Sequence, residues 1–147
     1  MMINELLQRY AEGERSFVDA DLRGVRLTDA VLSGVDLRGA DLSGAVLTRV
    51  SFWGANLTGA HLLGATLRGA DLRRARLTSA NLQSADLSEA LLIGADLTGA
   101  ELRGANLSGA NLYCAQMRPA QLQAALDAGA RIYDPALAEA RYAVLAR

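Results

Sequence analysis

Residue types that build catalytic and metal sites are nearly missing from this chain of 147 residues. It has one cysteine, Cys114, so no disulfide can form within the chain, and one histidine, His61. A metal site needs several ligands together, and Cys–His catalysis needs a positioned base, so two residues far apart in the sequence provide neither. The sequence also lacks a phosphate-binding loop and a dinucleotide fingerprint. We therefore expect no enzymatic activity, no metal and no cofactor.

Lysine and long apolar runs are also missing. All fifteen cationic residues are arginines, and acidic residues equal arginines in number between Phe17 and Arg118. This balance argues against a general nucleic-acid binder. No apolar stretch approaches the roughly twenty residues of a membrane helix, and polar residues such as Asn4 and Arg9 interrupt any N-terminal signal sequence. The sequence predicts a soluble, cytoplasmic protein that binds neither membranes nor nucleic acid.

What the sequence has in abundance is one five-residue repeat, which runs from residue 17 to residue 118. Two examples are residues 40–44, Ala-Asp-Leu-Ser-Gly, and residues 105–109, Ala-Asn-Leu-Ser-Gly. From Ala20 onward the first position is always Ala or Val. The second position is often Asp or Asn, the third is Leu, Phe or Met, and the fifth is most often Gly. A period of five fits neither a helix nor a flat strand, so each repeat must form a short side and then turn a corner, with the first and third positions inside.

This pattern resembles the pentapeptide repeat family over roughly residues 17–122, and residues 5–17 are similar to the N-terminal segment of cyanobacterial members. The resemblance implies an all-β solenoid, a right-handed quadrilateral β-helix of about five coils with four repeats in each coil. Residues twenty apart in the sequence would then stack on the same face, with coils roughly 4.8 Å apart. A packed interior of this kind leaves no cleft for a substrate, so a pocket could exist only at the capped ends or between subunits.

The two ends of such a coil would expose sheet edges that other parts of the chain must cover. We expect a helix at about residues 3–12, with Asn4 as its N-cap and Leu7 on the apolar side that faces the first coil. We expect one domain over residues 1–147, with a helical N-terminal cap (1–16), the repeat coil (17–118) and a helical C-terminal cap (119–147).

The C-terminal cap should contain two helices. Pro119 can begin the first, which should run to about Asp127, bury Leu122 and Leu126, and stop at Gly129. Residues 130–133 alternate like a short strand, and residues 135–146 predict a second helix that carries Leu137, Val144 and Leu145. This tail would cover the last coil or serve as a dimerisation element.

Because residues twenty apart should stack on the same face, the sequence also predicts one unusual outer face, centred on Phe52. Its outward positions hold five large apolar residues, whereas the other faces expose chiefly Val18, Val46 and Leu63. Arg73 should lie at the centre of this face, on the coil next to Trp53, with its guanidinium over the indole ring. We call the five apolar residues the apolar stripe: Val31, Trp53, Leu91, Ile93 and Tyr113.

A contiguous exposed apolar surface usually marks an interaction site. Two alternatives remain. The residues at these outward positions have varied without selection for a function, or the C-terminal tail covers this surface. A second feature, a group of four arginines, would be spread over three faces and predicts a solvated, partly ion-paired surface. These arginines are Arg68, Arg73, Arg74 and Arg76.

The first functional hypothesis is a non-enzymatic structural or protein-interaction module that binds an unidentified protein through the apolar stripe. A homodimer, formed through the caps or through the stripe, is the related alternative. The second hypothesis is a DNA mimic that modulates DNA gyrase or another type II topoisomerase, as members of the family linked to quinolone resistance do. The balanced charge of the coil and its Leu-filled third position disfavour this second hypothesis.

Overall fold

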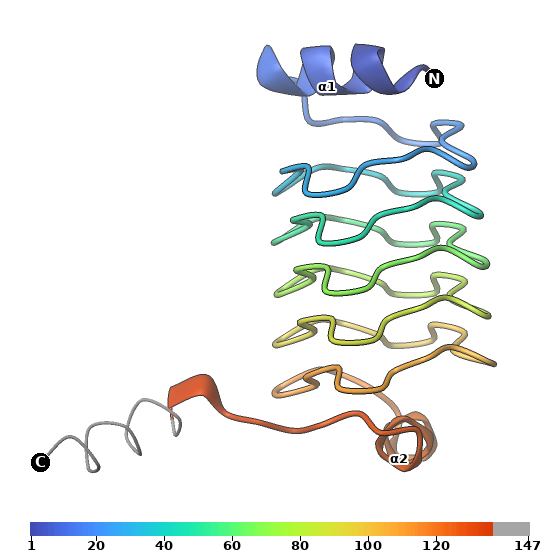
Figure 1. Cartoon of the computed structure of the whole chain (residues 1–147), viewed down its shortest axis with the longest axis vertical. Coiled ribbons are helices and arrows are strands. Elements are labelled where there is room, and N and C mark those ends of the chain that lie inside the picture. Colours follow the sequence, from blue (N-terminus) through green and yellow to red (C-terminus); the bar gives the residue numbers. More distant parts are fainter. Residues whose placement is uncertain (137–147) are drawn as a thin grey trace, which may run out of the picture.

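The computed structural model describes residues 1–136 and shows a column of stacked coils between two helices (Figure 1). Helix α1 spans Ile3–Ala11 and helix α2 spans Pro119–Asp127. Between them, the described residues contain isolated parallel bridges instead of continuous strands. Each repeat is too short for a regular strand, since it forms one bridge and then turns. Neither helix in residues 1–136 is long or apolar enough to cross a bilayer.

The bridges join residues that are twenty positions apart. Asp21 pairs with Asp41, Asp41 pairs with His61, and the other bridges follow the same register. Four repeats therefore make one coil, as predicted. Backbone hydrogen bonds hold the coils together; for example, the Leu42 N–H donates to the His61 carbonyl oxygen at 2.7 Å. The right-handed sense of the coil remains a prediction.

Local backbone geometry explains which residues the repeat prefers at its second and fifth positions. The N–H of Ser43 donates to a carboxylate oxygen of Asp41 at 3.0 Å, and the N–H of Thr58 donates to the amide oxygen of Asn56 at 3.1 Å. An Asp or Asn side chain thus stabilises the corner from the second position. The fifth position takes a left-handed backbone, with φ of 66° at Gly44, which glycine adopts without steric cost.

The core consists of the first and third positions. The third-position residues from Leu22 to Leu97 and the first-position residues from Val35 to Ala100 are almost completely buried. Leu at the third position fills the interior, and Ala at the first position lets neighbouring segments of backbone approach closely. At the C-terminal end this burial weakens, because Leu102 and Ala105 are only half-buried.

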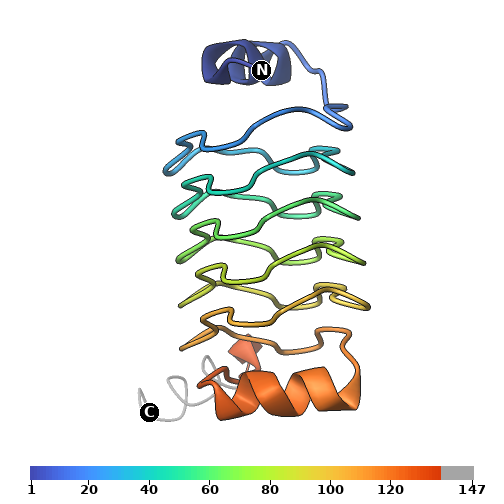
Figure 2. The ribbon, with the colours of Figure 1, turned by 90° about the vertical axis from the view of Figure 1, so that its right-hand side faces the viewer.

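Helix α1 covers the first coil (Figures 1 and 2). Leu6 is completely buried and belongs to the same apolar core as Phe17. Two details of the prediction are wrong. Met2 is the N-cap, without a side-chain hydrogen bond, so Asn4 lies inside the helix. Leu7 is 36% exposed, because the helix turns the side that carries Ile3, Leu6 and Tyr10 towards the core.

Helix α2 lies across the other end of the column, as Figure 2 shows. Its bounds match the prediction, and Gly129 follows it with φ of 96°. Ala125, rather than Leu122 or Leu126, is its buried residue. The chain then returns to the stack, where Arg131 bridges Asn111 in the same register of twenty. Pro135 and Ala136, the predicted start of the second helix, are helical, and the rest of that predicted helix, with Leu137, Val144 and Leu145, lies outside the described residues.

Candidate protein-binding face

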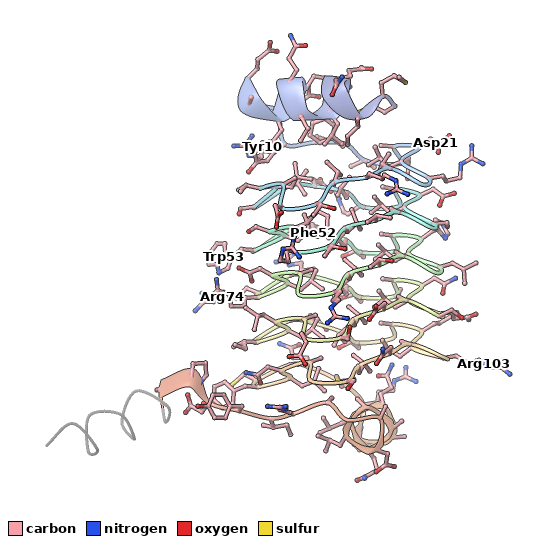
Figure 3. The ribbon with its side chains drawn as sticks, in the orientation of Figure 1. Tyr10, Asp21, Phe52, Trp53, Arg74 and Arg103 are labelled. Carbon is pink, nitrogen blue, oxygen red and sulfur yellow. The ribbon has the colours of Figure 1, made fainter. Side chains whose placement is uncertain are left out.

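The apolar stripe lies on two adjacent outward columns. Bridges link Val31 to Ser51, Asp71 to Leu91, and Leu91 to Asn111, which places these residues one above another. The second column begins two residues further along each repeat and contains Trp53 and Ile93. Figure 3 shows Trp53 projecting from the side of the column. Sequence counting therefore assigned these residues to one face because the coil has no insertion that would shift the register.

The stripe residues differ in exposure. Val31 is 62% exposed, Trp53 45% and Leu91 36%, whereas Ile93 and Tyr113 are half-buried. Trp53 is the largest side chain among them, so it offers the most area to a partner. On other faces Leu63 is exposed to a similar degree, 47%, and stands apart from the stripe. It therefore provides a matched control position.

Arg73 does not cover Trp53, in contrast to the prediction. Its guanidinium forms two hydrogen bonds with the Asp71 carboxylate, of 2.8 Å from Nε and 2.7 Å from one terminal nitrogen. Within residues 1–136, cation–π contacts join Arg9 to Phe17 and Arg15 to Tyr10 instead. A bidentate pair two residues apart is favoured because both side chains leave the same short side of the coil. The stripe thus has an ion pair between Trp53 and Leu91.

This ion pair shifts the titration of both groups. The hydrogen bond from Arg73 lowers the pKa of Asp71, and that from Asp71 raises the pKa of Arg73. The pKa of Asp71 in the folded protein lies below its ordinary value. The pair therefore stabilises the fold at any pH above that ordinary pKa. This contribution is lost as the pH falls through the folded pKa.

We predict that Arg73→Gln raises the pKa of Asp71 towards the ordinary carboxyl value, 3.8. The carboxyl carbon chemical shift of Asp71, followed by NMR between neutral and acid pH, measures this change. Arg49→Gln serves as the control, since Arg49 pairs with Asp29 on another face. If the Arg73 variant leaves the titration of Asp71 unchanged, groups other than Arg73 lower the pKa of Asp71.

The C-terminal tail reaches the lower end of the stripe. The side chain of Asn111 donates to the Tyr133 carbonyl at 2.9 Å and accepts from the Tyr133 N–H at 3.1 Å. The Tyr113 hydroxyl lies 3.2 Å from a carboxylate oxygen of Asp134, and this hydrogen bond raises the pKa of Tyr113. Asp134 therefore contacts the stripe at Tyr113, while Val31, Trp53 and Leu91 stay exposed.

One exposed aromatic residue that extends this face, Tyr133, was not predicted from the sequence. It is 46% exposed and hydrogen-bonds to Asn111 through its backbone. Tyr133 stands twenty residues after Tyr113, so the same counting could have found it. The repeat pattern ends at Met117, however, and nothing in the sequence alone shows that the register of twenty survives the helix.

The remaining candidates offer no chemical site. Of the four clustered arginines, only Arg73 has an ion-pair partner among residues 1–136. Arg74 and Arg76 border a shallow depression that also contains the Asp96 carboxylate, which opposes the binding of an anion. No group of three or more His, Cys, Asp or Glu residues in the described part of the chain could hold a metal ion. His61 and Cys114 are both exposed.

A family model for pentapeptide repeats matches residues 16–54, 45–83, 55–92 and 85–123. The chain belongs to the pentapeptide repeat family. Among solved pentapeptide repeat proteins, one from Nostoc is 33% identical, with a TM-score of 0.50 over 90% of this chain and 96% of that one. One from the thylakoid lumen of Arabidopsis thaliana is 29% identical, with a TM-score of 0.57 over 78% and 83%.

A third pentapeptide repeat protein, from the cyanobacterium Cyanothece, is 23% identical, with a TM-score of 0.50 over 80% of this chain and all of that one. At this identity it supports the fold alone. A comparison with curated proteins found no match. The resemblance to the family, including its cyanobacterial members, is thus confirmed.

Proposed function

We propose that this pentapeptide repeat protein is a non-enzymatic interaction module that binds a protein partner through the apolar stripe. The observation that carries the proposal is the exposure of Val31, Trp53 and Leu91 on one face of the coil. Each coil is hydrogen-bonded to the next, so these side chains stand on a rigid support and lose little backbone entropy on binding. The right-handed coil and the cytoplasmic location belong to the same proposal.

Trp53 is the expected anchor of this interface. Buried tryptophans dominate the binding energy of many protein interfaces when they fill a pocket on the partner near the centre of the contact. Trp53 lies one coil from the middle of the stripe, between Val31 and the Asp71–Arg73 pair. We expect the partner to offer an apolar pocket to this side chain.

The Asp71–Arg73 pair sets a condition on that partner. Removing an ion pair from water is costly unless additional hydrogen bonds compensate it. Asp71 is already half-buried, while the Arg73 side chain is 46% exposed. A matching partner should therefore surround its apolar pocket with polar groups that bond to the outer side of Arg73. This requirement would contribute specificity more than affinity.

The test is capture from a native cell extract with three baits, each first shown by circular dichroism to be folded. They are the wild type, Trp53→Asp, and the control Leu63→Asp, which adds the same charge at a similarly exposed position. We expect a partner that the wild type and the control retain and that Trp53→Asp loses by at least about tenfold, as for an interface anchor.

Two results would contradict the proposal. If all three baits retain the same proteins, the stripe is not the binding face. If Trp53→Asp changes only the sedimentation of the purified protein, the stripe joins copies of this chain. A topoisomerase among proteins lost with Trp53→Asp would instead favour the DNA-mimic hypothesis.

A further inference from the structure

Between Ala100 and Ser108, at the C-terminal end of the coil, three backbone N–H groups whose equivalents one coil earlier donate to the next coil have no acceptor among residues 1–136. They belong to Leu102, Gly104 and Leu107; the N–H groups of Gly99, Cys114 and Met117 in the same coil also lack one. One coil earlier, the equivalent groups are all satisfied. The N–H of Leu82 donates to Glu101 at 2.8 Å, that of Ser84 to Arg103 at 2.9 Å, and that of Leu87 to Asn106 at 2.7 Å. These three free donors form an open sheet edge.

Helix α2 creates this edge because it takes the place of the next coil. Gln121, which would bridge Glu101 if the coil continued, lies in the helix instead, and its side chain donates to the Ala100 carbonyl at 2.6 Å. The chain returns to the regular register only at Arg131, whose N–H donates to the Ala110 carbonyl at 2.7 Å. Between these two points, the carbonyl of Ala105 also lacks a donor in the described residues.

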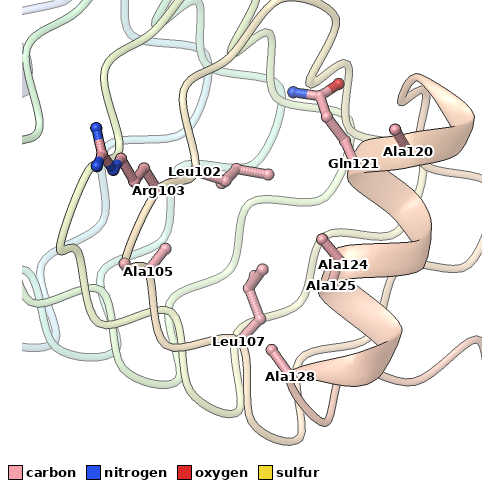
Figure 4. Close-up of a pocket in the computed structure, with 10 residues that line it drawn as sticks. Leu102, Arg103, Ala105, Leu107, Ala120, Gln121, Ala124, Ala125 and Ala128 are labelled. Carbon is pink, nitrogen blue, oxygen red and sulfur yellow. The ribbon is translucent and has the colours of Figure 1, made fainter.

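A groove of about 480 Å³ runs along this open edge, between the last coil and α2. Figure 4 shows Leu102 pointing across it towards the helix. The wall formed by α2 consists largely of alanines, which leave room beside the edge instead of filling it. The residues of this wall are Ala120, Gln121, Ala124 and Ala125 of α2 and its C-cap, Ala128.

Among the described residues that line this groove, Arg103 is the only charged one, and none carries a carboxylate. The free N–H groups add partial positive charge along the edge. In the preceding coil, the position of Arg103 is occupied by Gln83, which hydrogen-bonds to Glu101 of the coil below. A repeat added beneath Arg103 would therefore place its equivalent residue beside the guanidinium, and Asp or Glu fits there.

We propose that this groove binds an acidic peptide segment of a partner, which follows the corner of the last coil as one further repeat. Its carbonyl oxygens would accept from Leu102, Gly104 and Leu107, and one of its N–H groups would donate to Ala105. Its carboxylate would pair with Arg103. Main-chain bonds supply affinity in this mode of recognition, and side-chain positions supply specificity. This site is separate from the apolar stripe, so either proposal can fail alone.

The probe is the decapeptide Ala-Asp-Leu-Ser-Gly-Ala-Asp-Leu-Ser-Gly, which repeats residues 40–44 twice and carries two carboxylates. NMR of the labelled full chain reports each amide directly. On titration to millimolar peptide, we expect the amide protons of Leu102, Gly104 and Leu107 to move downfield. Their hydrogen exchange should slow by about tenfold or more. Gly64, whose N–H already bonds to Gln83, should not change.

Matched variants distinguish binding in the groove from nonspecific peptide binding. Ala124→Phe should fill the groove and abolish the shifts, whereas Gln123→Phe, on the exposed side of α2, should retain them. Arg103→Glu should weaken binding by about tenfold and Arg68→Glu should not. A peptide with Asn in place of both Asp residues should lose affinity for the wild type and not for Arg103→Glu.

Four results would overturn the proposal. The first is the absence of shifts at millimolar peptide. The second is slow exchange of the three amides in the free protein at high dilution, which would show that the edge is already covered. The third is protection that rises with protein concentration, which would assign the edge to a second copy of this chain. The fourth is equal binding by Ala124→Phe.

Discussion

Replacing Leu62 by alanine is expected to lower the free energy of unfolding by about 2–5 kcal/mol. Leu62 is completely buried at a third position in the middle of the column, with Leu42 and Leu82 in the equivalent positions of the neighbouring coils. The backbone around it is fixed by bonds to both coils; for example, the Leu62 N–H donates to Asn81 at 2.8 Å. The cavity left by the substitution cannot collapse easily, because these hydrogen bonds fix the spacing between the coils. Guanidinium denaturation followed by circular dichroism measures the change.

The neighbouring residue provides the control. Leu63 is 47% exposed, so Leu63→Ala should change the free energy of unfolding by no more than about 0.5 kcal/mol. Two adjacent leucines would then differ severalfold in effect, solely because one points into the coil and the other points out. Equal losses for the two variants would contradict the assignment of inward and outward positions on which the apolar stripe also depends.

Most of the coil could be predicted from the sequence because its period and its constraints are both local. Ala or Val at the first position and Leu at the third leave only one pair of positions that can point inward. Helix α2 was also predictable, since Pro119 and Gly129 mark its two ends. The orientation of Leu7 was not, because a short helix with apolar residues on several sides is oriented by the surface that it covers.

The candidate sites were predictable to different degrees. Trp53 and Leu91 were assigned to one face by counting alone. The partner of Arg73 could not be found in this way, because both the indole of Trp53 and the carboxylate of Asp71 lie within reach of a long side chain, and the bidentate hydrogen bonds decide between them. The groove beside Leu102 depends on where α2 lies relative to the last coil, and no periodicity in the sequence determines that position.

The first position of the repeat should be the least tolerant of larger side chains. Three valines occupy it, and each has alanine in the first position of the adjacent coils wherever the repeat continues. Val50, for example, lies between Ala30 and Ala70. Two large residues would have to share a coil spacing of roughly 4.8 Å, which the backbone hydrogen bonds do not allow to widen. The pattern indicates that the first position accepts valine in place of alanine only where the first positions of the adjacent coils hold alanine.

We therefore predict that Ala70→Leu lowers the free energy of unfolding by about 1–3 kcal/mol, although it adds apolar surface to the core. Ala70 is completely buried and stacks against Val50, which is also completely buried. In the double variant Val50→Ala/Ala70→Leu, the space released at residue 50 should restore part of this loss, with a coupling energy of about 0.5–3 kcal/mol. Denaturation of the two single variants and the double variant gives that coupling directly. Additive effects would mean that the two positions do not compete for the same space, and that alanine is required at the first position by the backbone rather than by the neighbouring coil.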